Sequence, residues 1–196
     1  ADAYLRDIIA GTKGEEGTEA ANHMTAQGKK DIEEVGRKIR DYFKRMGEIP
    51  LTNDIKLFSD RMKVAGETDI ITVDSLGNIR IYDLKTTGNR ANIASENEKG
   101  ELVYGKSFND YQKQLSCYKS LFEEMYGVPV SNLAIIAIEI GKKGEKNKPL
   151  ETLINSANFA FDNIYPVNYD ASIRKFGFLV NKNLVPLNFI SRIMLD

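Results

Sequence analysis

Two neighbouring segments place carboxylates and a lysine on strand faces that also carry aliphatic side chains. Along the first segment Asp69 alternates onto the same face as Ile71, and along the next Asp83 and Lys85 share a face with Ile81. A buried charge costs several kcal/mol unless it is paired or binds a metal ion. The placement therefore indicates a cation-binding site. The alternative is a solvated strand end with an ion pair between aspartate and lysine.

The triplet Asp83-Leu84-Lys85 gains weight from the residues on either side of it. A D-x-K triplet alone is weak evidence, because about 0.7 such triplets are expected by chance in a chain of this length. A second one, Asp54-Ile55-Lys56, lacks comparable neighbours. The first follows Gly66-Glu67-Thr68-Asp69 and precedes a helix on which Gln114 and Tyr118 share a face.

The spacing of apolar residues predicts the elements that must position these side chains. Residues three and four apart predict a helix that begins between Thr18 and Lys29 and ends at Gly47, and a second helix that ends at Gly127. Alternation predicts a strand, a long hairpin and a buried strand, over residues 55–58, 62–85 and 133–140. The second helix is then a crossover connection between strands, which indicates an α/β fold with helices packed on a sheet.

The length of the hairpin loop decides whether the two aspartates can share a cation. A two-residue turn at Gly77-Asn78 would place Asp69 and Asp83 on opposite faces of the sheet. A three-residue loop that pairs Ser75 with Ile79 places them on one face. We therefore predict an odd-length loop or a bulge, with the two carboxylates close enough to share a cation.

The composition fits a single globular domain. The chain has 196 residues, of which 42% are hydrophobic and 28% are charged. The lone cysteine, Cys117, and the lone histidine, His23, exclude an internal disulfide and a multi-histidine zinc site. The sequence shows neither a membrane-length apolar run nor a signal-like N-terminus, which predicts a cytoplasmic protein without a membrane partner. The polar stretch 86–107 is expected to be a long connection of the kind that often forms a lid.

The net charge of −1 requires any nucleic acid to be met by a local basic patch. Two groups of lysines are candidates for phosphate contacts, and the alternative for each is a contribution to solubility. The first group comprises Lys106, Lys113 and Lys119, and the second comprises Lys142, Lys143, Lys146 and Lys148.

On these motifs the sequence resembles the RecB-like branch of the PD-(D/E)xK nuclease superfamily, which includes phage-type and mitochondrial genome-maintenance exonucleases. The resemblance covers roughly residues 17–140 and rests on three ordered motifs: Gly66 to Asp69, Asp83 to Thr86, and Gln114 with Tyr118. It implies a PD-(D/E)xK nuclease-like core, a central mixed sheet flanked by helices. We expect one such domain over residues 1–196, with 141–196 as its C-terminal extension.

The resemblance also implies the roles of the site residues. Asp69, Asp83 and the Leu84 carbonyl would hold one or two Mg²⁺ or Mn²⁺ ions, which prefer oxygen ligands. Lys85 would stabilise the developing anion or position the nucleophile. Gln114 and Tyr118 would orient Lys85 and grip a phosphate, and their alternative is ordinary helix packing.

The extra metal ligand of this branch is often a histidine in a Gly-Thr-x-x-His motif. Here Gly17-Thr18 precedes His23 by two residues too many. His23 is therefore either a metal ligand or an exposed surface residue. Glu33 or Glu34 could supply the first-helix ligand instead.

The resemblance implies a metal-dependent nuclease that hydrolyses DNA, acting as an exonuclease on ends or single strands in replication, recombination or repair. The expected partners are single-stranded DNA or duplex ends, and a helicase or another replication or recombination protein. Two alternatives stay open. One is a module on a nuclease fold that binds nucleic acid or protein without cutting, and the other is a site-specific or RNA endonuclease.

Overall fold

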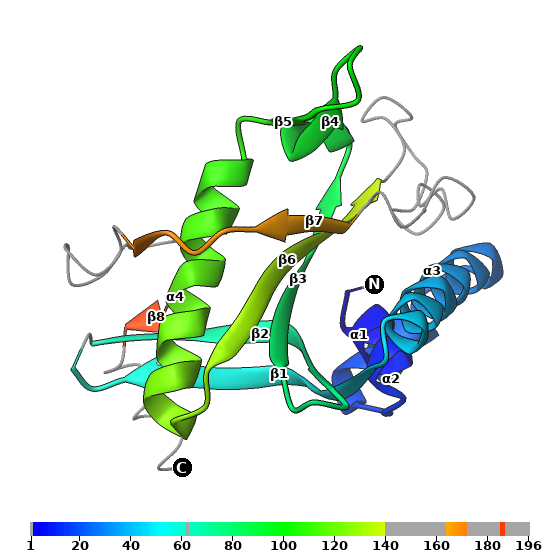
Figure 1. Ribbon diagram of the computed structural model, residues 1–196. Coiled ribbons are helices and arrows are strands. Elements are labelled where there is room, and N and C mark those ends of the chain that lie inside the picture. Colours follow the sequence, from blue (N-terminus) through cyan, green and yellow to red (C-terminus); the bar gives the residue numbers. More distant parts are fainter. Residues whose placement is uncertain (1, 62, 140–163, 172–184, 187–196) are drawn as a thin grey trace.

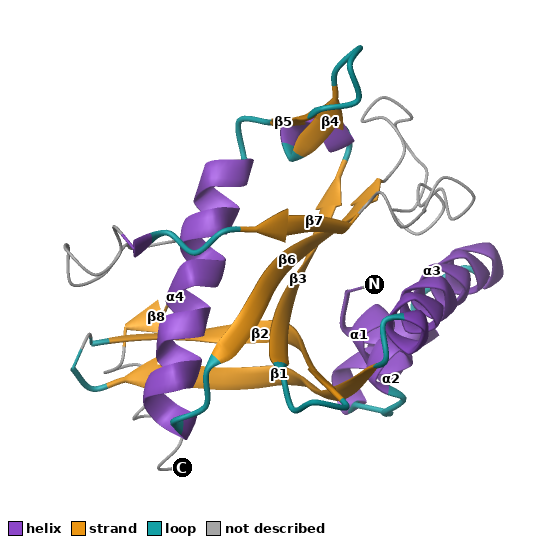
Figure 2. Ribbon diagram, viewed as in Figure 1, coloured by secondary structure: helices purple, strands orange, loops and turns teal. Residues whose placement is uncertain are grey.

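One curled sheet with helices on both faces organises the chain (Figures 1 and 2). The computed structural model describes residues 2–61, 63–139, 164–171 and 185–186. Within these residues the sheet has six strands in the order β1-β2-β3-β6-β7, and β8 pairs with β2. The strands are β1 (Glu48–Ser59), β2 (Val64–Asp74), β3 (Ile79–Thr87), β6 (Val130–Glu139), β7 (Ile164–Val167) and β8 (Val185–Pro186). The expected α/β class is confirmed.

Helices cover the two faces of the sheet unequally (Figure 1). Three helices, α1 (Asp2–Ala10), α2 (Glu15–Asn22) and α3 (Ala26–Arg45), lie on one side, and α4 (Phe108–Tyr126) lies on the other. Between β3 and α4 the chain forms a short 3₁₀ turn, η1 (Arg90–Asn92), and a two-stranded sheet of β4 (Ala94–Glu96) and β5 (Leu102–Tyr104). None of the helices in the described residues is long and apolar enough to span a bilayer.

Each face of the sheet has its own hydrophobic core, because side chains alternate along a strand. Ile71 and Ile81 pack with the apolar side of α4, while Ile70 and Tyr82 pack with α1 and α3. On α3 the buried positions recur at three- and four-residue spacing, as the sequence predicted: Ile32, Val35, Ile39 and Phe43.

Most of the predicted elements are confirmed, with different ends. The first predicted helix is α3, which begins after the N-cap Thr25, whose hydroxyl accepts from the Gly28 amide at 3.0 Å. The second is α4, which ends at Gly127 in the left-handed conformation, with φ 65°. The predicted strand at 55–58 is part of the longer β1. The helices α1 and α2 were not predicted, nor was the β4–β5 hairpin within the expected connection 86–107.

The hairpin between β2 and β3 has an odd-length loop, as predicted, but it is longer than three residues. Val73 pairs with Ile79, so the loop holds five residues, and the expected pairing of Ser75 with Ile79 is wrong. The Asp74 carboxylate explains the difference, because it accepts hydrogen bonds from the amides of Leu76 and Asn78 at 3.0 and 2.9 Å. Hydrogen bonds from Asn78 also lower the pKa of Asp74 to about 2.

Gly17 lies on α2 at a place where this helix packs closely against α1. Asp7 accepts hydrogen bonds from the Thr12 hydroxyl at 3.0 Å and from the Gly14 amide at 2.8 Å, which hold its carboxylate in place. A Cβ atom at Gly17 would lie 2.0 Å from Asp7 Oδ2 and 3.2 Å from the main-chain oxygen of Ala3. Only a residue without a side chain lets α2 come this near to α1.

We expect Gly17→Ala to lower the free energy of unfolding by about 1–3 kcal/mol, as overpacking does elsewhere. Urea denaturation followed by circular dichroism measures this. Gly88→Ala is the control, because a Cβ atom there meets nothing within 4 Å and the backbone is not in the left-handed region. Equal urea midpoints for the two variants would show that the contact with Asp7 does not require glycine at position 17.

Candidate active site

The site forms where β2 and β3 separate. Their pairing runs from Val73 with Ile79 to Ile70 with Tyr82 and goes no further, while β3 continues beside β6 in parallel pairing as far as Thr87. Figure 1 shows β1 and β2 crossing away from β3 and β6 at this place. A strand that loses its neighbour leaves backbone groups that need new partners.

Asp69 supplies one of these partners. Its Oδ2 atom accepts a hydrogen bond from the Leu84 amide at 2.7 Å, just beyond the last paired residues of the hairpin. Its Oδ1 atom lies 3.1 Å from Nη1 of Arg6, and both side chains are mostly buried, with 14% exposure for Arg6 and 16% for Asp69. The Asp69 carboxylate is therefore fixed at both oxygens.

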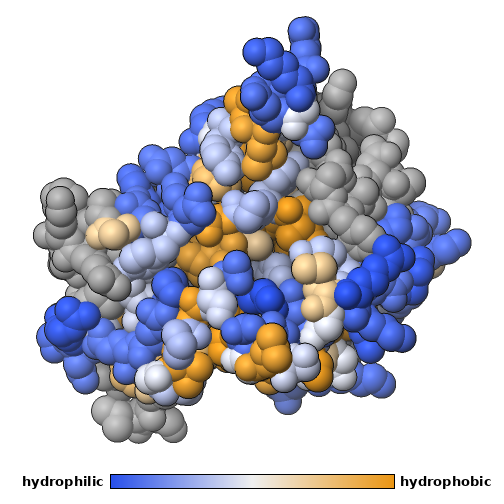
Figure 3. All heavy atoms as spheres, viewed as in Figure 1, coloured by the Kyte–Doolittle hydropathy of each residue, from blue (hydrophilic) through white to orange (hydrophobic). Residues whose placement is uncertain are grey.

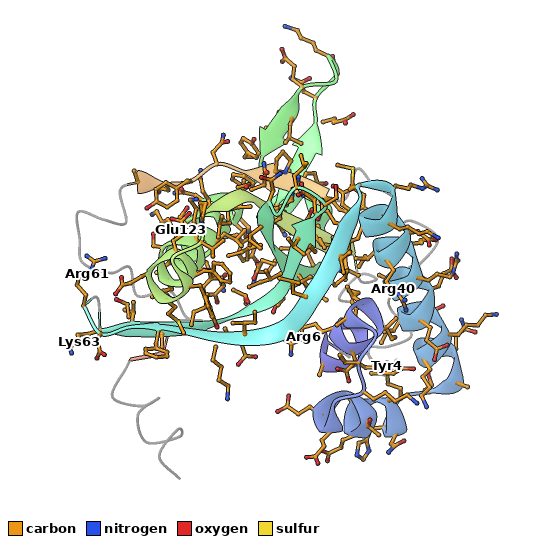
Figure 4. All side chains as sticks on the ribbon, turned by 60° about the horizontal axis from the view of Figure 1, so that its bottom comes forward. Tyr4, Arg6, Arg40, Arg61, Lys63 and Glu123 are labelled. Carbon is orange, nitrogen blue, oxygen red and sulfur yellow. The ribbon has the colours of Figure 1, made fainter. Side chains whose placement is uncertain are left out.

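Arg6 was not among the predicted site residues. It comes from α1, on the opposite side of the sheet from α4 (Figure 4). Its Nη1 atom donates to Asp69, which is 63 positions away in the sequence. Arg6 does not belong to a recognisable motif. Its neighbours on α1, Leu5 and Ile9, are core residues. Sequence spacing carries no signal for such a contact.

Asp83 is the buried carboxylate of the site, with 2% exposure. It alternates with Tyr82 and Leu84, which face α3, and therefore lies on the side of α4. Lys85 Nζ lies 2.7 Å from Asp83 Oδ2. Burial raises the pKa of Asp83, Lys85 lowers it, and the nearby Asp69 raises it again, with a net upward shift.

Lys85 stays protonated in this setting. Burial by itself lowers the pKa of Lys85, but the adjacent Asp83 outweighs burial and the net direction is upward. The Nζ atom also lies 5.0 Å from the centre of the Tyr111 ring, a cation–π contact. The two aspartates are thus balanced by two cations, Lys85 and Arg6.

Helix α4 presents a row of polar side chains to this cluster. Tyr111, Gln114 and Tyr118 recur at three- and four-residue spacing, and the Gln114 amide donates to the Tyr118 hydroxyl at 2.7 Å. Gln114 therefore pairs with Tyr118, and the residue in contact with Lys85 is Tyr111. Tyr111 was not predicted, although its position three residues before Gln114 could have pointed to it.

Tyr118 and Gln114 are both buried. Burial raises the pKa of Tyr118, and the nearby Asp83 and Asp69 add to the shift, so its hydroxyl remains protonated at neutral pH. Gln114 Oε1 is buried and accepts no hydrogen bond from the part of the chain that is described. The pair can offer polar contacts to a ligand but cannot titrate near neutrality.

The donors at the site fit a hard divalent cation. Asp69 and Asp83 provide carboxylate oxygens, and their like charges favour a cation close to both. Mg²⁺ commonly uses one or two carboxylates and keeps several waters, so a larger protein ligand set is not required. Among the described residues no group of three or more His, Cys, Asp and Glu side chains comes together.

The proposed extra ligands lie elsewhere. His23 ends α2 with an exposed side chain. Glu33 accepts a hydrogen bond from the Tyr4 hydroxyl at 2.6 Å, and Glu34 pairs with Lys38 at 3.4 Å. The structure does not bring any of these three together with both aspartates.

The lysines that were predicted to contact phosphates differ in their surroundings. Lys119 Nζ pairs with Glu123 at 2.6 Å and also donates to the main chain of β6, so it serves the fold. Lys106 is exposed beside the start of α4, and Lys113 is half-buried on that helix. The second patch, Lys142 to Lys148, lies outside the described residues.

Comparison with known proteins bears on this site. A family model described as the PD-(D/E)XK nuclease superfamily matches residues 1–172. No curated protein gives a significant match to the chain. A solved structure of a "putative exonuclease" from Eubacterium rectale is similar, with a TM-score of 0.46 and 16% identity, over 97% of this chain and 64% of that chain. The chain thus spans 64% of the length of that protein.

The pairing of Gln114 with Tyr118 gives a stability prediction. Tyr118→Phe removes the acceptor and leaves a buried amide N–H unpaired, so it should lower the free energy of unfolding by about 1–3 kcal/mol. Adding Gln114→Leu removes the donor as well, and the double variant should be the more stable of the two. Urea denaturation of both variants checks this, and a double variant that is less stable than Tyr118→Phe would contradict the pairing.

Proposed function

The chain belongs to the PD-(D/E)XK nuclease superfamily, and we propose that it hydrolyses DNA phosphodiester bonds with the help of a divalent metal ion. Membership supports a nuclease and a nucleic-acid substrate. The observation that carries the finer proposal is the convergence of Asp69, Asp83 and Lys85 where β2 and β3 separate. The order of these residues in the sequence supports assignment to the RecB-like branch.

The metal ion of the proposal is Mg²⁺ or Mn²⁺. Asp69 and Asp83 would hold it through their carboxylates, with the main-chain carbonyl of Leu84 as a further oxygen ligand. When bound, such an ion supplies an activated water and neutralises charge on the leaving oxygen. Arg6 keeps the Asp69 side chain in place through its contact with Oδ1.

Lys85 has the properties of an electrostatic stabiliser in this reaction. Its ammonium group is held beside Asp83 and is kept protonated by it. From there it can donate to a non-bridging oxygen of the scissile phosphate and stabilise the negative charge that develops there. Tyr111 lies against the ammonium group and restricts its position.

The biological role is proposed on the motif order alone. The RecB-like resemblance favours an exonuclease that acts on DNA ends or single strands in replication, recombination or repair. A non-cutting module is disfavoured, because both aspartates and the lysine are present and close together.

We expect the protein to degrade linear DNA with Mg²⁺ or Mn²⁺ and to stop in EDTA. Asp83→Asn and Lys85→Ala should each lower the rate by about 100-fold or more, since the first removes a carboxylate that would hold the metal ion and the second removes the ammonium group that would stabilise the developing charge. The release of labelled nucleotides from single-stranded, linear duplex and circular DNA, and from RNA, measures the rate.

The control for this assay is Lys63→Ala. Lys63 is exposed at the turn between β1 and β2, and Figure 4 shows it at the far end of these strands from Arg6, so its removal should leave the rate unchanged. Wild-type rates in Asp83→Asn or Lys85→Ala would refute the assignment of the site. Activity on circular DNA equal to that on linear DNA would refute the exonuclease role.

Metal binding should also be visible without catalysis. A ligand at 100 times its dissociation constant stabilises the folded state by about 2.7 kcal/mol, which corresponds to a rise in Tm of about 5 °C or more. We expect Mn²⁺ to raise the Tm of the wild type in this way and to have little effect on Asp69→Asn and Asp83→Asn. Asp41→Asn, an exposed change on α3, should respond like the wild type. An equal response in all variants would place the ion elsewhere.

A further inference from the structure

The β4–β5 hairpin projects from the body of the protein next to the start of α4 (Figure 1). Its second strand, β5, exposes three successive apolar side chains: Leu102 at 37%, Val103 at 48% and Tyr104 at 50%. Figure 3 shows hydrophobic residues over this part of the surface, below the hydrophilic tip of the hairpin. Leu102 and Tyr104 lie on one face of this strand and Val103 on the other.

Tyr104 is held in a fixed position. Its ring stacks on that of Phe108, with 3.9 Å between the centres and an angle of 21° between the planes. Phe108 is buried at the first turn of α4. Next to Tyr104, the Gly105 amide donates to the Ile93 carbonyl at 2.8 Å, and a Cβ atom at Gly105 would lie 2.2 Å from the Ala91 oxygen. One face of the half-exposed Tyr104 ring is therefore supported by the buried Phe108 ring.

This aromatic pair leads directly to the candidate active site. Phe108 and Tyr111 are three residues apart on α4 and share a face of the helix. The Tyr111 ring in turn lies 5.0 Å from Lys85 Nζ. From the other side, β3 ends at Thr87, only two residues after Lys85, before the chain enters the hairpin. The exposed ring and the catalytic lysine are thus joined along both α4 and β3.

We propose that Tyr104 is a stacking platform for an unpaired base of a single-stranded nucleic acid whose backbone enters the active site. This rests on the proposed function and names its substrate class. A flat aromatic ring with one supported face is the chemistry that binds a nucleobase through its π-face, and such stacking is tolerant of sequence. Bases in a duplex are already stacked on one another, so the platform favours a strand that is unpaired.

The charges around the ring indicate which side of the hairpin the strand follows. Lys106 is exposed two residues after Tyr104 and can contact a phosphate. The tip of the hairpin carries three exposed glutamates, Glu96, Glu98 and Glu101, against one exposed lysine, Lys99, so its net negative charge repels a phosphate backbone. The strand should therefore pass the base of the hairpin, beside α4, and avoid its tip.

The test uses the full chain in the Asp83→Asn background, so that bound DNA is not cut. A single-stranded oligonucleotide that contains 2-aminopurine reports stacking through the quenching of its fluorescence. Tyr104→Ala should abolish the quenching and weaken binding by about 5- to 100-fold. Tyr104→Phe should retain both. Val103→Ala is the matched control, because Val103 is equally exposed but points to the opposite face of the same strand.

The outcomes separate this proposal from the proposed function. If the otherwise wild-type enzyme cuts single strands and Tyr104→Ala leaves KM, binding and quenching like those of Val103→Ala, the platform is overturned while the nuclease stands. If quenching depends on Tyr104 but no nucleic acid is cut with Mg²⁺ or Mn²⁺, the platform stands and the proposed function fails. Sedimentation gives a third outcome: self-association that Tyr104→Ala abolishes would assign the surface to a second copy of the chain and overturn the platform.

Discussion

Two carboxylates that approach each other in a buried position must be balanced by positive charge. Asp69 and Asp83 meet where water is largely excluded, and the pKa of Asp83 rises because of burial and because of its neighbour. Lys85, on β3 with Asp83, and Arg6, on α1, provide this positive charge. The two carboxylates also provide the oxygen atoms that the proposed divalent metal ion would use as ligands.

The separation of β2 from β3 is what makes room for this cluster. A continuous hairpin would have used the Leu84 amide in its ladder, whereas here that amide donates to the Asp69 carboxylate. Because β3 stays paired with β6, Asp83 and Lys85 are held on a rigid strand even though one neighbour has left. Helix α4 then closes the open side with Tyr111 and Tyr118. The proposed metal site would need carboxylates that are held in fixed positions, and the pairing of β3 with β6 holds Asp83 in this way.

Contacts between distant parts of the chain required the tertiary structure. Nothing in the spacing of α1 indicates that Arg6 reaches Asp69, because that contact depends on how the helix docks on the sheet. Likewise the sequence did not indicate that Gln114 hydrogen-bonds to Tyr118 or that Tyr111 lies against Lys85, and the predicted roles of Gln114 and Tyr118 toward Lys85 stay predictions. Several side chains on one face of a helix can reach the same neighbour, and the packing of the helix on the sheet determines which of them makes the contact.

The sequence by itself determined the α/β class, the hairpin and the odd length of its loop. These follow from periodicity, since side-chain direction repeats every two residues along a strand. The actual loop length was decided by the Asp74 carboxylate, which binds the amides of the turn. The tertiary structure alone decided that Arg6 is the second counter-ion. That contact joins residues 63 positions apart in the sequence, which no local pattern encodes.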